Sequence, residues 1–337
     1  MTTPFFSIII PVYNGLSNGL PECLDSIWSQ PLSSDLYEVI TVDDCSTDDT
    51  RQWLYEQAQL HTNMQVVENE VNIRQGGGRN RGVKVARGKY ILFIDQDDYY
   101  HKDSLLKVYE LLQEYPELDV LMCDNAIQYV GHESNKLQLN LHSEEVYATG
   151  LEFLEKNGWA IAPWRYCIKR DFYLSKDLWF AEGCRIEDVD WVFKLFRYAG
   201  KMKYFRLLLI HYNKGTGSTT DNTYKNFEIL SGGNKAACRL YEVAQTLYVG
   251  TDAYHIVADI AEFYFNCTCK SLFGSYWPIK VQKELLQTIP LKHSKHKLLN
   301  FALRHSTLFC IMTNIGVIPF RIARYFRRKM KARKYEG

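Results

Sequence analysis

The stretch Gly88-Lys-Tyr-Ile-Leu-Phe-Ile-Asp-Gln-Asp-Asp98 constrains the fold of this chain more than any other. Its residues 90–94 form an unbroken apolar run, which predicts a short strand buried on both faces of a sheet. The run ends in three carboxylates within four positions, Asp95, Asp97 and Asp98. Because the ligand site of an open α/β sheet lies beyond the carboxyl ends of its strands, we expect these acids to lie at a site.

This acidic cluster has two interpretations. Crowded carboxylates repel each other unless a cation lies between them, and Mg²⁺ in particular shares one or two carboxylates with substrate phosphates. Alternatively, the cluster is an acidic turn before the helix that begins near Lys102, since Asp is a favoured turn and N-cap residue. The pattern Asp-x-Asp alone does not decide between them.

Length and composition indicate an ordinary globular protein with one large domain or a domain plus an appendage. The chain has 337 residues, 46% of them apolar and 23% charged, and a net charge of +1 that gives no overall attraction to nucleic acid. Its nine cysteines are scattered and no secretion signal precedes the first strand, so we expect reduced thiols in a cytoplasmic setting. The sequence contains no uninterrupted apolar run of about 18 residues, so we do not expect a helix that spans a membrane.

Strands and helices alternate through the first part of the chain. Short apolar runs typical of strands occur at residues 5–12, 37–42, 64–67, 90–94 and 120–123. The stretches between them have apolar residues at helical spacing. This alternation predicts βαβ units and a parallel sheet. The periodicity fades over residues 125–149, which we expect to be a long loop or hairpin, and returns as strands at 164–169 and 202–212 and a helix at 189–199. Beyond about residue 226 the pattern is helical only.

A second strand also ends in acids, because Asp43 and Asp44 follow residues 37–42. These acids either hold a nucleotide base or ribose, or form a turn that caps the next helix. Between the two acidic strand ends lies Asn72-Ile-Arg-Gln-Gly-Gly-Gly-Arg-Asn-Arg-Gly82, whose glycines let backbone N–H groups approach an anion. Arg79 offers a planar fork to a carboxylate, phosphate or base. The stretch matches neither the Gly-x-Gly-x-x-Gly fingerprint nor a Walker A loop.

Seven short motifs occur in order between residues 5 and 218. They are Phe5-Phe-Ser-Ile-Ile-Ile-Pro-Val-Tyr-Asn14, Val42-Asp-Asp-Cys-Ser-Thr-Asp48, Arg79-Asn-x-Gly82, Ala86-Arg-Gly-Lys-Tyr90, Asp95-Gln-Asp-Asp98, Leu178-Trp-Phe-Ala-Glu-Gly183 and Glu187-Asp188. Together they resemble the family 2 glycosyltransferases. The departures are modest: Cys45 stands where that family usually has Gly, and Arg74 and Gly78 stand where Gly and Ala are common.

The resemblance implies a GT-A fold, an α/β architecture with a mostly parallel sheet flanked by helices, and inverting transfer from a nucleoside diphosphate sugar to a glycan or lipid-linked acceptor. It implies a divalent metal, Mn²⁺ or Mg²⁺, with Asp97 as its main ligand and Asp95 reaching the ribose or sharing the ion. The implied donor-binding residues are Pro11, Tyr13, Asp43, Asp44, Arg79, Asp95 and Gln96. The pattern does not settle which of Asp43 and Asp44 contacts the base.

Inversion in one displacement requires a base that takes the proton of the acceptor hydroxyl. Asp188 is our candidate, because it begins the helix at 189–199, where the helix dipole keeps a carboxylate ionised. The alternative is an ordinary pair of acids at a helix N-terminus. Because the upstream motifs are also present, we expect Asp188 to be the base and Glu187 to orient the site or bind the acceptor.

Two further side chains have both a functional and a structural interpretation. Trp164 is expected either to stack on the acceptor or to pack in the core, since sugars stack on aromatic faces and Trp is equally a core residue. His211 precedes a Gly/Ser/Thr loop at 214–220 that could close over the diphosphate. A structural role for this histidine is favoured over a metal or phosphate contact.

The C-terminus is strongly basic, and its charges alternate with apolar residues. The basic residues are Arg321, Arg324, Arg327, Arg328, Lys329, Lys331, Arg333 and Lys334. A basic amphipathic helix predicts attachment to an anionic lipid surface, here the inner face of the cell membrane, while a solvated or RNA-binding tail is the alternative. We therefore predict a GT-A domain over 1–225, a helical region over 226–310 and a basic amphipathic tail over 311–337.

Two other functions fit parts of the pattern. A nucleotidyltransferase that makes sugar nucleotides would use a related sheet, but no Gly-rich, Lys-bearing triphosphate loop follows the first strand. A non-catalytic, membrane-associated carbohydrate-binding protein would not need its acids, whereas both Glu187-Asp188 and Asp95-Gln-Asp are intact.

Overall fold

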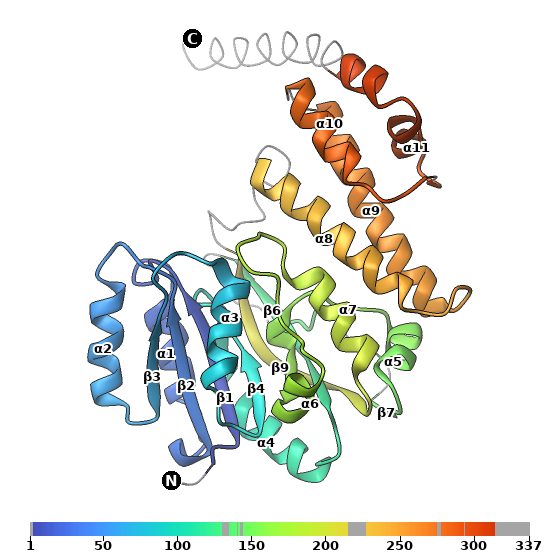
Figure 1. The fold of residues 1–337 in the computed structure, drawn as a ribbon. Helices are drawn as coiled ribbons and strands as arrows, with labels where there is room; N and C mark the ends of the chain where they lie inside the picture. The colour runs from blue at the N-terminus through green and yellow to red at the C-terminus, as the bar shows by residue number, and fades with distance from the viewer. Residues whose placement is uncertain are drawn as a thin grey trace, which may run out of the picture. The chain divides into compact units, whose positions relative to one another are not determined.

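The computed structural model describes residues 3–129, 135–139, 141, 144–214, 227–274, 278–292 and 294–313. The chain divides into two compact units, Met1–Ser218 and Thr219–Gly337 (Figure 1). Most of the predicted basic tail, residues 314–337, and the predicted loop over 215–220 lie outside the described residues.

The first part of unit 1 is the parallel βαβ arrangement that the sequence predicts. Its strands β1 (Phe6–Val12), β2 (Tyr37–Asp43), β3 (Met64–Glu68) and β4 (Tyr90–Phe93) pair in parallel in the order β3-β2-β1-β4. Strands β1, β2 and β4 are buried along their whole length, as their apolar runs require. Helices α1 (Leu20–Trp28), α2 (Thr50–Leu60) and α3 (Arg74–Val85) connect them. The acids that follow β2 and β4 therefore lie at one edge of the sheet.

The remainder of the sheet is mixed. Strand β8 (Tyr166–Lys169) lies antiparallel between β4 and β6 (Val120–Tyr129). Strand β9 (Met202–Lys214) pairs in parallel with β6 and antiparallel with β5 (Tyr99–Tyr100) and β7 (Val146–Tyr147). The expected loop from residue 125 was wrong in part, because β6 continues to Tyr129. Register shifts at Asp124, and the buried polar side chains around it, break the apolar pattern that would have revealed this strand.

Five further helical segments pack around this half of the sheet. They are α4 (Ser104–Glu114), α5 (Gly150–Asn157), the 3-10 turn η2 (Pro163–Arg165), α6 (Arg170–Ser175) and α7 (Asp188–Tyr198). A Cβ on Gly150 would lie 2.5 Å from the carbonyl oxygen of Phe196, so only glycine lets α5 begin this close to α7. Trp191 on α7 is fully buried and stacks on Phe180 with ring centroids 4.3 Å apart, so it packs in the core.

The regular secondary structure in the described residues of unit 2 consists of helices, as the sequence predicts. Its helices are α8 (Phe227–Gln245), α9 (Asp252–Gly274), α10 (Ile279–Gln287) and α11 (Lys297–Arg304). Within the described parts of the chain, no helix combines the length and the apolar character that crossing a membrane requires.

Candidate active site

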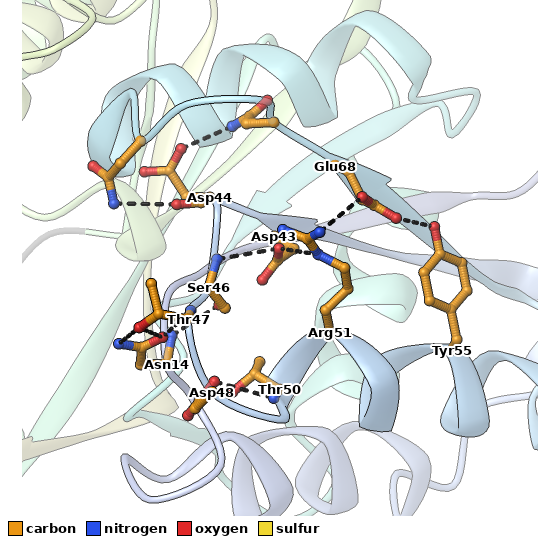
Figure 2. A network of polar contacts seen from close by, with 12 residues as sticks. Asn14, Asp43, Asp44, Ser46, Thr47, Asp48, Thr50, Arg51, Tyr55 and Glu68 are labelled. Carbon is orange, nitrogen blue, oxygen red and sulfur yellow. Dashed lines mark hydrogen bonds and ion pairs between the residues drawn. The ribbon is translucent and has the colours of Figure 1, made fainter.

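The carboxylate of Asp43, at the end of β2, is fully buried. Its Oδ2 accepts hydrogen bonds from Arg51 Nε at 3.0 Å and from the Ser46 backbone N–H at 3.3 Å, and Figure 2 shows Asp43 lying between these two residues. Among the described residues, no donor lies within hydrogen-bond distance of its Oδ1. Arg51 also lies 3.5 Å from Glu68, whose carboxylate accepts a hydrogen bond from Tyr55. Asp43 is thus held through one oxygen by Arg51 of α2 and by the backbone of the turn before that helix.

Asp44 organises the segment that leads into α3. Its Oδ1 accepts from Asn69 Nδ2 at 2.9 Å and from the Ile73 N–H at 2.8 Å, and its Oδ2 accepts from the Arg74 N–H at 2.7 Å. Arg74 has a φ of 65° and Cys45 a φ of 64°, both in the left-handed region. These are two positions where the sequence departs from the family's common glycine, so side-chain-bearing residues here adopt the conformation that glycine adopts freely.

We expect Asp44→Ala to lower the free energy of unfolding by about 2–4 kcal/mol, because three N–H donors, on the buried Asn69 and the half-buried Ile73 and Arg74, lose their acceptor. Chemical denaturation of the purified variant measures this loss. The matched control is Asp49→Ala, since Asp49 is exposed and its side chain makes no capping hydrogen bond at the start of α2. Equal stabilities of the two variants would contradict the prediction.

The three acids after β4 have different surroundings. Asp95 Oδ1 accepts a hydrogen bond from Arg79 Nη2 at 2.6 Å. The buried Asp98 accepts a hydrogen bond from the Asn213 N–H at 2.9 Å through Oδ1, and among the described residues its Oδ2 has no hydrogen-bond partner. Asp97 is exposed as a residue, yet the protein around its carboxyl, and then the charge of Asp95, raise the pKa of Asp97 to about 6. Burial, followed by the charges of Asp95 and Asp97, also raises the pKa of Asp98.

Gln96 and Pro11 both lie next to the backbone that leads from the end of β1 to Tyr13. The Gln96 amide accepts from the Tyr13 N–H at 2.8 Å and donates to the Tyr13 carbonyl at 3.1 Å, so it fixes the backbone that carries the tyrosine. Pro11 is buried in β1, and a Cβ on Gly78 would lie 3.0 Å from its Cβ. The side chain of Tyr13 is 44% exposed, so its ring is the accessible one of these three groups.

Arg79 joins the acids after β4 to the acids before α7. Its Nη1 donates to Glu187 Oε1 at 2.7 Å and its Nη2 donates to Asp95 Oδ1 at 2.6 Å. The arginine is only 2% exposed, and its guanidinium carbon lies 5.2 Å from the ring centroid of Phe180. The sequence left a carboxylate, a phosphate or a base open as its partner, and the structure gives it two carboxylates.

Asp188 begins α7, immediately after the Glu187 that Arg79 holds. Burial, and then the charge of Glu187, raise the pKa of Asp188 to about 7, while the nearby Arg79 opposes this shift. A carboxyl group that titrates near neutral pH suits a general base. Arg79 contacts Asp95 and Glu187, two acids from distant parts of the sequence, and Asp188 directly follows Glu187.

Two candidates lie in the interior. Trp164 is 7% exposed and stacks on Tyr212 with ring centroids 5.8 Å apart, so it offers no open face for a sugar and the acceptor-binding prediction is corrected to a core role. His211 is 6% exposed and contacts His101 at 2.8 Å and Gln128 at 2.5 Å through its two ring nitrogens. Burial, and then His101, lower the pKa of His211 to about 4, which supports the structural role that the sequence favoured.

The sequence did not reveal four polar residues that build this site. They are Arg51, Asn69, Asn80 and Asn213. Asn80 lies inside a quoted motif and was given no role, while the other three lie in segments whose local pattern carries no signal for these long-range contacts.

The acids after β4 fit a divalent ion. Carboxylate oxygens are the hard ligands that Mg²⁺ and Mn²⁺ take, and burial, followed by the charges of the neighbouring acids, raises the pKa values of Asp97 and Asp98. No group of three or more His, Cys, Asp or Glu side chains within the described residues is arranged to bind a metal. The donor set therefore fits an ion that Asp97 and Asp95 share with substrate phosphates better than an ion enclosed by protein.

The sequence model of Glycosyl transferase family 2 matches residues 7–178, about half of the chain. The chain belongs to this family. Among its relatives, a poly(ribitol-phosphate) beta-glucosyltransferase of Bacillus spizizenii is 42% identical over 109 residues, which are 32% of this chain and 17% of the relative. The poly(ribitol-phosphate) beta-N-acetylglucosaminyltransferase TarS of Staphylococcus aureus is 37% identical over 118 residues, 35% of this chain and 20% of TarS.

A third relative matches over a longer stretch. EpsJ of Bacillus subtilis, described as an uncharacterized glycosyltransferase, is 28% identical over 227 residues, 66% of this chain and 64% of EpsJ. The matched stretch thus spans a fifth or less of the first two relatives and slightly under two thirds of EpsJ.

Solved structures with the same fold include two with nucleotide sugars. S. aureus TarS 1–349 in complex with UDP-GlcNAc has a TM-score of 0.65 at 21% identity, covering 94% of this chain and 92% of that one. The mannosyltransferase PcManGT of Pyrobaculum calidifontis, in complex with GDP-Man and Mn²⁺, has a TM-score of 0.52 at 15% identity, covering 94% and 88%. This likeness confirms a GT-A fold with a helical C-terminal region.

Proposed function

We propose that this chain transfers a sugar of the hexosyl or N-acetylhexosaminyl type from a nucleoside diphosphate sugar to a glycan or lipid-linked acceptor, with inversion. One observation carries the proposal: a single buried guanidinium, that of Arg79, joins the acids at the donor-side strand end to the acids that begin α7. Membership of family 2 and the names of the relatives support the same class of reaction, and point to surface polysaccharide synthesis.

The donor would lie at the edge of the sheet where β2 and β4 end. The exposed ring of Tyr13 and the carboxylates of Asp43 and Asp44 form the nucleoside end in this proposal. Asp97 and Asp95 would hold the divalent ion, which when bound would supply stabilisation of the negative charge on the leaving diphosphate. Pro11 and Gln96 support this pocket through the backbone around Tyr13.

Asp188 acts as the general base in this proposal. The acceptor hydroxyl oxygen forms a bond to the anomeric carbon while the bond from that carbon to the diphosphate oxygen breaks, and the hydroxyl proton passes to the Asp188 carboxylate. The hydroxyl oxygen attacks the anomeric carbon from the face opposite the leaving group, so the anomeric configuration inverts. Its pKa of about 7 allows it to be ionised before the reaction and to accept a proton during it.

A hydrolysis screen tests the reaction class. Wild-type protein is incubated with UDP-glucose, UDP-galactose, UDP-N-acetylglucosamine and GDP-mannose, each with and without Mn²⁺. We expect Mn²⁺-stimulated release of nucleoside diphosphate from at least one donor. Nucleoside triphosphate formed from added pyrophosphate would instead support the nucleotidyltransferase, and binding without any turnover would support the non-catalytic carbohydrate-binding protein.

We also propose that residues 311–337 attach the protein to an anionic membrane surface, as a peripheral protein at the cytoplasmic face. Each basic residue near an anionic bilayer is worth about 1 kcal/mol. Replacing Arg327, Arg328, Lys329 and Lys331 with Gln should therefore weaken binding to phosphatidylglycerol vesicles by up to about 10³-fold. Flotation with phosphatidylcholine vesicles is the control, and failure of the wild type to float with anionic vesicles would refute this attachment.

A further inference from the structure

One face of α3 holds the segment that leads to the proposed base. Asn80 Nδ2 donates to the Phe180 carbonyl and to Glu182 Oε1, both at 3.0 Å, and its Oδ1 accepts from the Phe180 N–H at 2.9 Å. A Cβ on Gly76 would lie 2.7 Å from the Ala181 carbonyl oxygen and 2.9 Å from Glu187 Cγ. The helix therefore contacts residues 180–187 closely, both through hydrogen bonds and through a glycine that allows the approach.

Arg79 lies on this same helix and is the charged part of the contact. Arg79 is 2% exposed, so its guanidinium has almost no accessible surface. Its two terminal nitrogens are directed to Asp95 and Glu187 at 2.6 and 2.7 Å. The planar fork of Arg fixes two carboxylates in one geometry, whereas the ammonium of Lys is a single point charge on a flexible stem.

We propose that Arg79 is a positioning residue that sets where Asp188 lies relative to the donor, acting through Glu187, and that it does not contact the donor. This inference rests on the proposed function. Glu187 directly precedes Asp188 at the start of α7, so a shift of its carboxylate shifts the first turn of that helix. A displacement of about 1 Å at a catalytic group costs about 10²-fold in rate. Asp43 and Asp44, which form the proposed nucleoside end, are held by Arg51 and Asn69. Nucleoside binding therefore does not depend on this link, whereas Asp95 connects Arg79 to the proposed ion site.

The test separates turnover from nucleotide affinity. Arg79→Lys should lower kcat for hydrolysis of the best nucleotide sugar in the screen by about 10²-fold. Its Kd for UDP or GDP without Mn²⁺, measured by calorimetry, should stay within about threefold, a shift of less than about 0.7 kcal/mol. Asn80→Ala, which weakens the same contact without changing charge, should also lower kcat and leave Kd unchanged. The matched control is Arg81→Lys, an exposed arginine on the same helix, which should change neither quantity.

Several results would overturn the proposal. Wild-type kcat in Arg79→Lys would do so, as would a Kd raised tenfold or more with unchanged kcat, because that pattern belongs to a donor contact. If the Arg79 variant does not fold, Glu187→Gln gives the same test from the other partner, and near-normal kcat there would equally overturn it. Wild-type protein that binds neither UDP nor GDP would refute the proposed function together with this inference, whereas intact binding with unchanged turnover in the variants counts against Arg79 alone.

Discussion

Asp188→Asn should lower the rate of sugar transfer by about 10²–10⁴-fold at neutral pH while leaving nucleoside diphosphate binding intact, since that range is the usual contribution of a general base. Asparagine keeps the size of the side chain at the start of α7 but cannot accept the hydroxyl proton. Steady-state turnover and calorimetry with UDP or GDP measure the two quantities separately. The control is Asp171→Asn, whose side chain is 88% exposed and which should behave as wild type.

The pH profile gives a second measurement on the same residue. A general base works in its deprotonated form, so the wild-type rate should be highest above the pKa of Asp188, about 7, and should fall as the pH is lowered through that value. The Asp188→Asn variant should lack this acidic limb. Near-normal turnover in the variant, or an unchanged acidic limb, would remove Asp188 from the mechanism.

The strands and their acidic ends could be predicted from the sequence because their signals are local. The apolar run before Asp95 and the start of α7 at Asp188 both follow from neighbouring residues, and the structure confirms both elements. Strand β6 was harder, because Asp124 is buried within it, where Arg165 and Tyr204 donate to its carboxylate. Without knowledge of those partners, a charged residue in a strand is interpreted as the beginning of a loop.

The pairing of side chains could not be predicted from local pattern. Arg79 is 16 residues from Asp95 and 108 from Glu187, and nothing at either distance marks the two acids as its partners. Asp44 similarly accepts hydrogen bonds from a segment about 25–30 residues away, which the local pattern does not mark as its partner. For Trp164, residue type alone did not distinguish a ring that faces a sugar from one that packs in the core, and only burial decided between them.

Besides Asp188, the largest loss of turnover is expected on substitution of Asp97. Of the three acids after β4, Asp95 is bound to Arg79 and Asp98 to Asn213, whereas Asp97 is the exposed one. Its carboxylate is therefore the group best placed to bind an ion that substrate phosphates share. Charge stabilisation by such an ion is worth several kcal/mol in a transition state, and each 1.36 kcal/mol is a factor of ten in rate.

Asp97→Asn should accordingly lower Mn²⁺-dependent turnover by about 10²-fold or more and abolish most of its stimulation by Mn²⁺. A titration of hydrolysis rate against Mn²⁺ concentration measures both. Asp103→Asn is the matched control, because it makes the same change of charge six positions later at a residue whose left-handed backbone suits Asn and whose side chain makes no capping hydrogen bond. If the Mn²⁺ dependence of Asp97→Asn matched that of the control, the ion would have to be bound elsewhere, and the acidic cluster would return to the role of a turn before α4.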